Sequence, residues 1–207
     1  ANQLFGAKQN FPAVAKGEIE AAFSVNFQWG KTVPEMNVTL KPYSVTDIDI
    51  LRKWPGSEPA GYLDGLLEKK GVKNVVWMFT TNMSAYTSKG GPLINPEAFK
   101  GVKIRGLNKL VDAGLVALGA APSAMSGSKV YNALQTGVVD GAELPTATEE
   151  AAAKAPGQLP DKGMKVHIHN AEEIAAMKAV MEPAFNKAFE EAAGESGQKL
   201  LDMISKM

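Results

Sequence analysis

The stretch from residue 101 to residue 144, GVKIRGLNKLVDAGLVALGAAPSAMSGSKVYNALQTGVVDGAEL, constrains the fold most strongly. Short segments that favour strands, Val102–Arg105, Pro122–Met125 and Val138–Ala142, alternate with two segments whose apolar residues recur at helical spacing. A glycine follows each helical segment and can end it. Such alternation is typical of an α/β layer with a parallel sheet, in which ligands lie beyond the carboxyl ends of the strands.

The flanking sequence predicts further elements. Ile19–Phe27 and Asn74–Phe79 are rich in apolar residues and predict buried strands, and Ser84–Ser88 can pair with the second of them. Another short strand is expected at Val166–His169. Helices or helical turns are expected at Phe11–Lys16, Ile48–Trp54, Gly61–Lys70, Pro96–Lys100, Thr146–Lys154, in a long segment capped by Asn170, and at Lys199–Lys206 after Gly194 and Gly197.

Composition excludes several classes of function. The 207 residues suffice for one large domain or two small lobes. Acidic and basic residues both number 22, so the charge gives no argument for binding nucleic acid or an anionic membrane. The absence of cysteine excludes disulfides, thiolate metal sites and thiol nucleophiles. No apolar run approaches the roughly 18–20 residues of a membrane span, and the first residues do not resemble a signal peptide, so an exported protein would be represented in its mature form.

The strings FKGVKIRG, LGAAPSAM and KVYNALQTGVVDGAE, in this order and spacing, resemble the solute-binding proteins of tripartite ATP-independent periplasmic (TRAP) transporters. The segments that begin LFGAKQNF and KGMKVHIH resemble flanking parts of the same family. The resemblance implies an α/β, periplasmic-binding-protein type II-like fold with two α/β lobes. It also implies periplasmic capture of a small organic carboxylate and its delivery to TRAP membrane permease subunits, without catalysis, cofactor or metal.

Members of the resembled family are longer than this chain, so we expect one lobe to be incomplete. Residues 1–73 are expected to form a partial lobe one, residues 74–145 lobe two on the carboxylate side, and residues 146–207 a helical segment that returns to lobe one. We expect the first strand, helix and second strand of lobe one to be missing, and also, near Thr148–Ala155, a crossover strand, a helix and much of the bridging segment. A sheet without these strands exposes edges, which favours self-association. Two alternatives remain: an engineered or shortened fragment that folds without binding a ligand, and a small α/β enzyme.

Arg105 is the main candidate for ligand binding. It ends a predicted strand, and its guanidinium offers planar paired donors that match a carboxylate. In the resembled family, the arginine of the KIR motif holds the substrate carboxylate, and Arg105 occupies that place. The alternative is a surface arginine paired with an acid such as Glu97 or Asp112.

The other candidate ligand-binding residues lie on or near predicted strands: Asn26, Trp29, Trp77, Phe79, Asn82, Tyr86, Asn108, Met125 and Leu144. Trp77 and Phe79 share a strand face and can line an apolar pocket, with core packing as the alternative. Asn26 and Trp29 can face the cleft from the other lobe or simply anchor a loop. Leu144 stands where relatives often place an amide, which suggests altered selectivity.

His167 and His169 are separated only by Ile168, so their side chains would lie on the same face of a strand. Two imidazoles on one face can share a metal. No third ligand is evident nearby, and a solvated strand face is the ordinary explanation. The sequence has no GxSxG, GxGxxG or Walker pattern. Hydrolysis and nucleotide binding therefore have no motif to support them.

Overall fold

The computed structural model describes residues 4–6, 8–44, 48–79, 83–146 and 165–207. Within these ranges the elements are α1 (Asn10–Ala15), the 3₁₀ helices η1 (Asn26–Trp29) and η2 (Pro34–Leu40), α2 (Ile48–Lys53), α3 (Glu58–Glu68), β1 (Met83–Ser88), η3 (Pro96–Phe99), β2 (Lys103–Gly106), α4 (Ala113–Ala117), β3 (Ala121–Ala124), η4 (Gly127–Lys129), α5 (Val130–Gln135), β4 (Gly141–Thr146) and α7 (Ala171–Ser205). The chain is mixed α/β, as the sequence predicts.

One four-stranded sheet, in the order β1-β4-β2-β3, is built from the described residues. β2 pairs in parallel with both β3 and β4, so the parallel layer predicted for residues 101–144 is confirmed. β1 pairs with β4 in antiparallel register, from Met83 opposite Thr146 to Ser88 opposite Gly141. The predicted pairing of Ser84–Ser88 with Asn74–Phe79 is therefore wrong, because the edge of β4 provides the hydrogen-bonding partner instead.

Two glycines allow close backbone approaches around the sheet. A Cβ atom on Gly141 would lie 2.4 Å from the carbonyl oxygen of Thr87, so glycine lets β1 come up against the start of β4. A Cβ atom on Gly106 would lie 2.3 Å from a carboxylate oxygen of Asp112. This second glycine makes room for an acid at the carboxyl end of β2.

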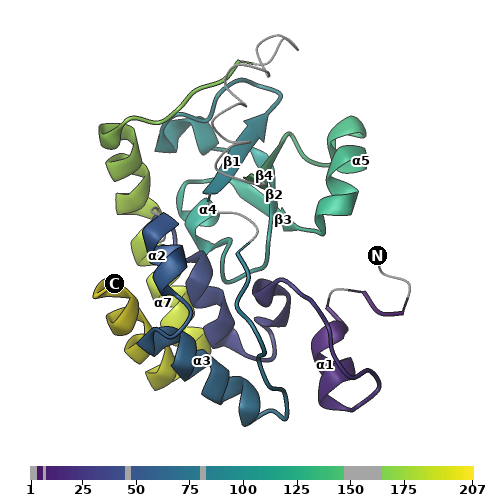
Figure 1. Ribbon diagram of the computed structural model, residues 1–207. Coiled ribbons are helices and arrows are strands. Elements are labelled where there is room, and N and C mark those ends of the chain that lie inside the picture. Colours follow the sequence, from purple (N-terminus) through teal and green to yellow (C-terminus); the bar gives the residue numbers. More distant parts are fainter. Residues whose placement is uncertain (1–3, 7, 45–47, 80–82, 147–164) are drawn as a thin grey trace.

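The molecule has two halves joined by α7 (Figure 1). The sheet lies in the upper half of the view, and α1 and α3 lie in the lower half. Each half has its own hydrophobic core. The sheet half buries residues such as Leu93, Phe99, Ile104, Leu115, Met177 and Met181. The other half buries residues such as Trp54, Leu63, Leu67, Phe185, Phe189 and Leu200. The methionines and phenylalanines of α7 thus enter both cores.

The long helix α7 begins and breaks where the sequence predicts. The Asn170 side chain accepts a hydrogen bond from the backbone N–H of Glu173 at 2.9 Å, and the Glu173 carboxylate accepts one from the backbone N–H of Asn170 at 2.8 Å. Gly194 has non-helical angles, φ 60° and ψ −141°, and separates the last turns from the rest. Pro183 lies inside the helix.

Three predicted strands are absent from the described residues. Residues 19–25 are irregular and lead into η1, while the segments Asn74–Phe79 and 166–169 form no ladder. Val75 is 87% exposed and Val76 is 62% exposed. A strand needs a hydrogen-bonded neighbour, and none of the described strands lies alongside these segments. The expectation of burial is wrong for Asn74–Phe79 because apolar composition does not reveal whether a neighbour exists.

The predicted helix Thr146–Lys154 falls, after Thr146, outside the described residues, and Thr146 itself ends β4. The described part of the lobe-one region, residues 4–73, contributes helices and irregular segments to the structure and no sheet strand. None of the described helices combines the length and the hydropathy needed to cross a bilayer.

Candidate ligand-binding cavity

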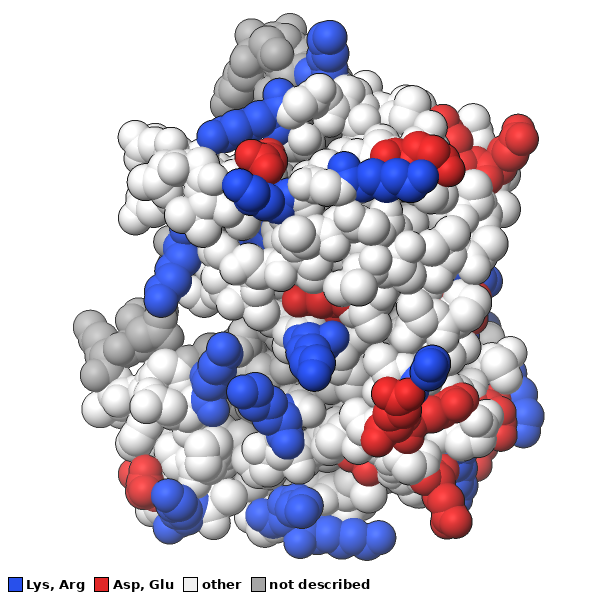
Figure 2. Space-filling view, turned by 180° about the vertical axis from the view of Figure 1, so that it is seen from behind, with Lys and Arg blue, Asp and Glu red and all other residues white. Residues whose placement is uncertain are grey.

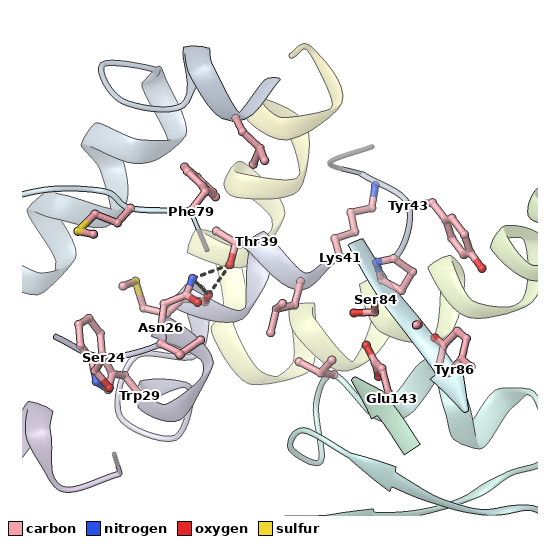
Figure 3. A pocket seen from close by; sticks show the side chains of 18 of the residues that line it. Ser24, Asn26, Trp29, Thr39, Lys41, Tyr43, Phe79, Ser84, Tyr86 and Glu143 are labelled. Carbon is pink, nitrogen blue, oxygen red and sulfur yellow. Dashed lines mark hydrogen bonds between the residues drawn. The ribbon is translucent and has the colours of Figure 1, made fainter. Parts of the chain in front are cut away.

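A cavity of about 1630 Å³ is lined by residues of both halves of the molecule. Typical small-molecule sites measure roughly 300–1,000 Å³, so there is room for a small ligand and water. Figure 3 shows its polar side chains in two groups, one on the sheet side and one near η1 and η2. Phe79 is seen on the side of the η1 group, and its ring lies 6.2 Å from that of Trp54.

The sheet side presents an acid surrounded by hydroxyl groups. Glu143 of β4 lies opposite Tyr86 of β1 in the ladder, so the two side chains share a face. The Ser84 side chain hydrogen-bonds to the Glu143 carboxylate. Tyr43 lies nearby and is electrostatically coupled to Glu143, and Lys41 from the end of η2 forms an ion pair with Glu182 of α7.

Burial dominates the electrostatics of this group. It raises the pKa of Glu143 to about 7, while the Ser84 hydrogen bond and the charge of Arg105 lower it and the charge of Asp112 raises it. Burial also raises the pKa of Tyr43 and Tyr86, and the nearby Glu143 charge adds to both shifts. The wall therefore offers a carboxyl group that changes charge near neutral pH, beside neutral phenols.

On the opposite side, Asn26 is held rigidly. Its amide donates to the carbonyl of Met36 at 3.1 Å and to the hydroxyl of Thr39 at 2.5 Å (Figure 3). The Trp29 ring lies 5.5 Å from the Phe11 ring, and its indole N–H has no hydrogen-bond partner among the described residues. Trp29 lines the cavity, although its indole nitrogen is itself buried.

Trp77 is fixed by its own contacts. Its indole donates to the Asp64 carboxylate at 3.0 Å, and its ring meets Trp54 edge-on at 5.8 Å. Of the residues predicted from sequence, the structure thus brings Asn26, Trp29, Trp77, Phe79 and Tyr86 to one cavity. Tyr86 also packs edge-on against Phe99 at 5.2 Å.

Arg105 does not line this cavity. It is 3% exposed, and its guanidinium donates from Nε to the carbonyl of Met125 at 3.1 Å and from Nη1 to the carbonyl of Glu143 at 2.6 Å. Arg105 lies opposite Ala142 in the ladder. Because side chains alternate along a strand, those of Arg105 and Glu143 leave the sheet on opposite faces.

The Arg105 guanidinium has no ion pair within 4.0 Å among the described residues. Asp112 is 4% exposed, and burial raises the pKa of its carboxyl to about 6, against the lowering effect of backbone hydrogen bonds and of Arg105. Burial lowers the pKa of Arg105, although Glu143 and Asp112 oppose this. The carboxyl end of β2 thus holds a buried cation, Arg105, whose direct hydrogen-bond partners are two neutral carbonyls.

The remaining predicted residues lie elsewhere. The Asn108 amide donates to the carbonyl of Phe27 at 3.3 Å and to Oδ1 of Asn37 at 2.9 Å, and its oxygen accepts from two backbone N–H groups, so it joins the two halves outside the cavity lining. Met125 offers its carbonyl to Arg105. Leu144 is the β4 residue opposite Ala85. Asn82 lies outside the described residues.

The two histidines border the cavity, with ring centroids 5.4 Å apart. His167 hydrogen-bonds to the Glu173 carboxylate at 2.8 Å. In the described part of the chain, no three His, Asp or Glu side chains are grouped so as to hold a metal ion.

The cavity is also lined by residues that were not predicted from the sequence: Glu143, Ser84, Tyr43 and Lys41. The signal for Glu143 was its place one residue before Leu144 on the same strand. Adjacent residues of a strand point to opposite faces of the sheet. Which of them faces the ligand is therefore known only once the pairing register of β4 with β1 is known.

The family model described as bacterial extracellular solute-binding protein, family 7 (DctP), matches residues 1–155. This chain belongs to that family. It is 35% identical to the C4-dicarboxylate-binding periplasmic protein DctP of Rhodobacter capsulatus over 146 residues, which are 70% of this chain and 43% of that protein. It is 32% identical over 142 residues to a solute-binding protein of Albidiferax ferrireducens, covering 68% of this chain and 41% of that protein. The chain therefore matches less than half the length of these relatives.

Among solved structures, the fold is similar to that of a TRAP periplasmic solute-binding protein from Desulfovibrio salexigens with bound orotic acid. The TM-score is 0.88 at 21% identity, over 99% of this chain and 85% of that chain. This likeness supports the periplasmic-binding-protein type II-like fold.

Proposed function

We propose that this family member captures a small organic carboxylate in the periplasm and presents it to the membrane permease subunits of a TRAP transporter, without chemical conversion. The family match and the carboxylates that its relatives are named for or hold support this proposal. Figure 2 shows Lys and Arg side chains interspersed with Asp and Glu side chains over one face of the molecule.

The observation that carries the proposal is the buried guanidinium of Arg105. Desolvating a cation is costly unless an anion or several hydrogen bonds compensate for it. Two carbonyls use two of its five N–H donors, and none of the described acids lies within ion-pair distance. A ligand carboxylate that reaches the carboxyl end of β2 would supply the missing negative charge.

The test is a thermal-shift titration with a panel of carboxylates. The chain offers a matched control, because Arg52 is the only other arginine and its side chain is 71% exposed. We expect the wild type and Arg52→Gln to be stabilised by the same acid, and Arg105→Gln to lose that stabilisation. Arg105→Lys keeps the charge but not the planar fork, so it should bind at least about tenfold more weakly.

Each variant is compared with its own ligand-free melting temperature, since Arg105→Gln also removes two hydrogen bonds and lowers stability. An equal shift in Arg105→Gln and the wild type would contradict a role for this guanidinium.

The alternative is a folded fragment that binds no ligand. The exposed apolar side chains of Val75 and Met78 favour it. No shift with any acid in the wild type would support this alternative. Self-association through exposed edges remains part of the proposal, and β1 and β3 are the edge strands of the sheet that the described residues form.

A further inference from the structure

The cavity wall provided by the sheet carries an acid, although the proposed ligand is itself an acid. The Glu143 carboxyl shares this wall with the hydroxyl groups of Ser84, Tyr86 and Tyr43 (Figure 3). Lys41 is the cation drawn near this group, but its ammonium group is already paired with Glu182. A ligand carboxylate that packed against this wall would meet an anion.

The charges around Glu143 determine which ligand groups can bind beside it. Arg105 contacts its backbone carbonyl from the opposite face, and Asp112 adds a negative charge at longer range. With burial holding the Glu143 pKa near 7, a ligand cation or hydroxyl next to it favours the ionised form, and a ligand carboxylate opposes it. The ionised carboxylate can accept hydrogen bonds but cannot donate them, so a ligand group that bonds to it must be a donor.

We propose that Glu143 determines the ligand class: the cavity takes a small acid that also carries an amino or hydroxyl group, and this group donates to the Glu143 carboxylate. This inference rests on the proposed function, and it concerns the ligand group that lies against the cavity wall at Glu143. The neighbouring phenols and Ser84 provide further donors and acceptors for such a polar substituent.

The test uses two series of acids that differ in one substituent each: succinate, malate and aspartate, and propionate, lactate and alanine. Isothermal titration calorimetry at pH 8 on the wild type should give tighter binding of the amino or hydroxy acid than of the unsubstituted acid in at least one series. In Glu143→Gln, the substituted acid should lose at least about tenfold in affinity, and the unsubstituted acid should lose nothing or gain.

Glu190→Gln is the matched control, because Glu190 is an exposed acid of α7 that is not among the residues lining the cavity. It should leave both affinities within about twofold of the wild type. Preference of the wild type for the unsubstituted acids, or an unchanged order in Glu143→Gln, overturns this inference and leaves the proposed function standing. Failure of all six acids to bind the wild type and Glu143→Gln overturns the inference together with the proposed carboxylate binding.

Discussion

Two apolar segments of this chain have opposite environments. Ile104 of β2 is fully buried between paired strands and helices, whereas Val75, in a segment of comparable apolar character, is 87% exposed. The difference is the presence of neighbours: β2 has a hydrogen-bonded strand on each side, and the Val75 segment has none among the described residues. An apolar segment tends to be buried, but it becomes buried only where another element packs against it or pairs with it.

The largest expected effect is the difference in stability between truncating Ile104 and truncating Val75. Ile104→Ala removes a side chain from a closed core and should lower the free energy of unfolding by about 2–5 kcal/mol. Val75→Ala should change it by less than about 0.5 kcal/mol, because the side chain already contacts water. Urea unfolding followed by circular dichroism measures both, and similar losses would show that the Val75 segment is packed in solution.

Glu143 should make the sheet half sensitive to pH. Its folded-state pKa of about 7 lies above the unfolded value of 4.5, so its stabilising contribution is complete below pH 4.5 and is lost as pH rises through 7. At pH 8, Glu143→Gln should therefore be more stable than the wild type by up to ~3 kcal/mol, a gain that vanishes at pH 4.5. Asp112, with a pKa of about 6, changes stability in the same direction in both proteins. Identical pH profiles for the two proteins would contradict the burial of this carboxyl.

A smaller effect is expected at the junction of the two halves. Asn108→Ala removes both amide contacts to Phe27 and Asn37 and should cost about 1–3 kcal/mol, because Asn37 is fully buried and loses a partner. Asn132→Ala on the exposed side of α5 is the control and should stay within about 0.5 kcal/mol of the wild type. Thermal unfolding of the three proteins provides the comparison, and equal stability would rule out the junction role.

The smallest change in folding free energy is expected for Val75→Lys, with a clear effect on association instead. A lysine in an exposed apolar segment blocks strand pairing between molecules. Light scattering at increasing protein concentration should show slower association of Val75→Lys than of the wild type. Glu68→Lys at the exposed end of α3 raises the net charge by two, against one for Val75→Lys, and should associate like the wild type. The same association rate in all three would exclude this segment as the contact.

The sequence predicted those parts of the fold whose partners are close in the chain. β2, β3 and β4 lie within 44 residues of one another, so their alternation with helices was sufficient. The capping box of Asn170 and Glu173 is likewise local. The apolar segment Asn74–Phe79 was predicted as a strand because its pattern cannot reveal an absent neighbour. At the candidate site, residue type predicted that aromatics such as Trp29 would line a cavity, but only the ladder register separates the face of Glu143 from that of Arg105.

The passage of α7 from one core to the other has a mechanical consequence. Met181 belongs to the core of the sheet half and Phe185 to the other core, and Pro183 lies between them. Proline has no backbone N–H to bond to the preceding turn, so α7 loses one stabilising hydrogen bond there. This less stiff turn lies between the part of α7 packed in the sheet half and the part packed in the other half. We expect any movement of one half against the other to bend α7 at this turn.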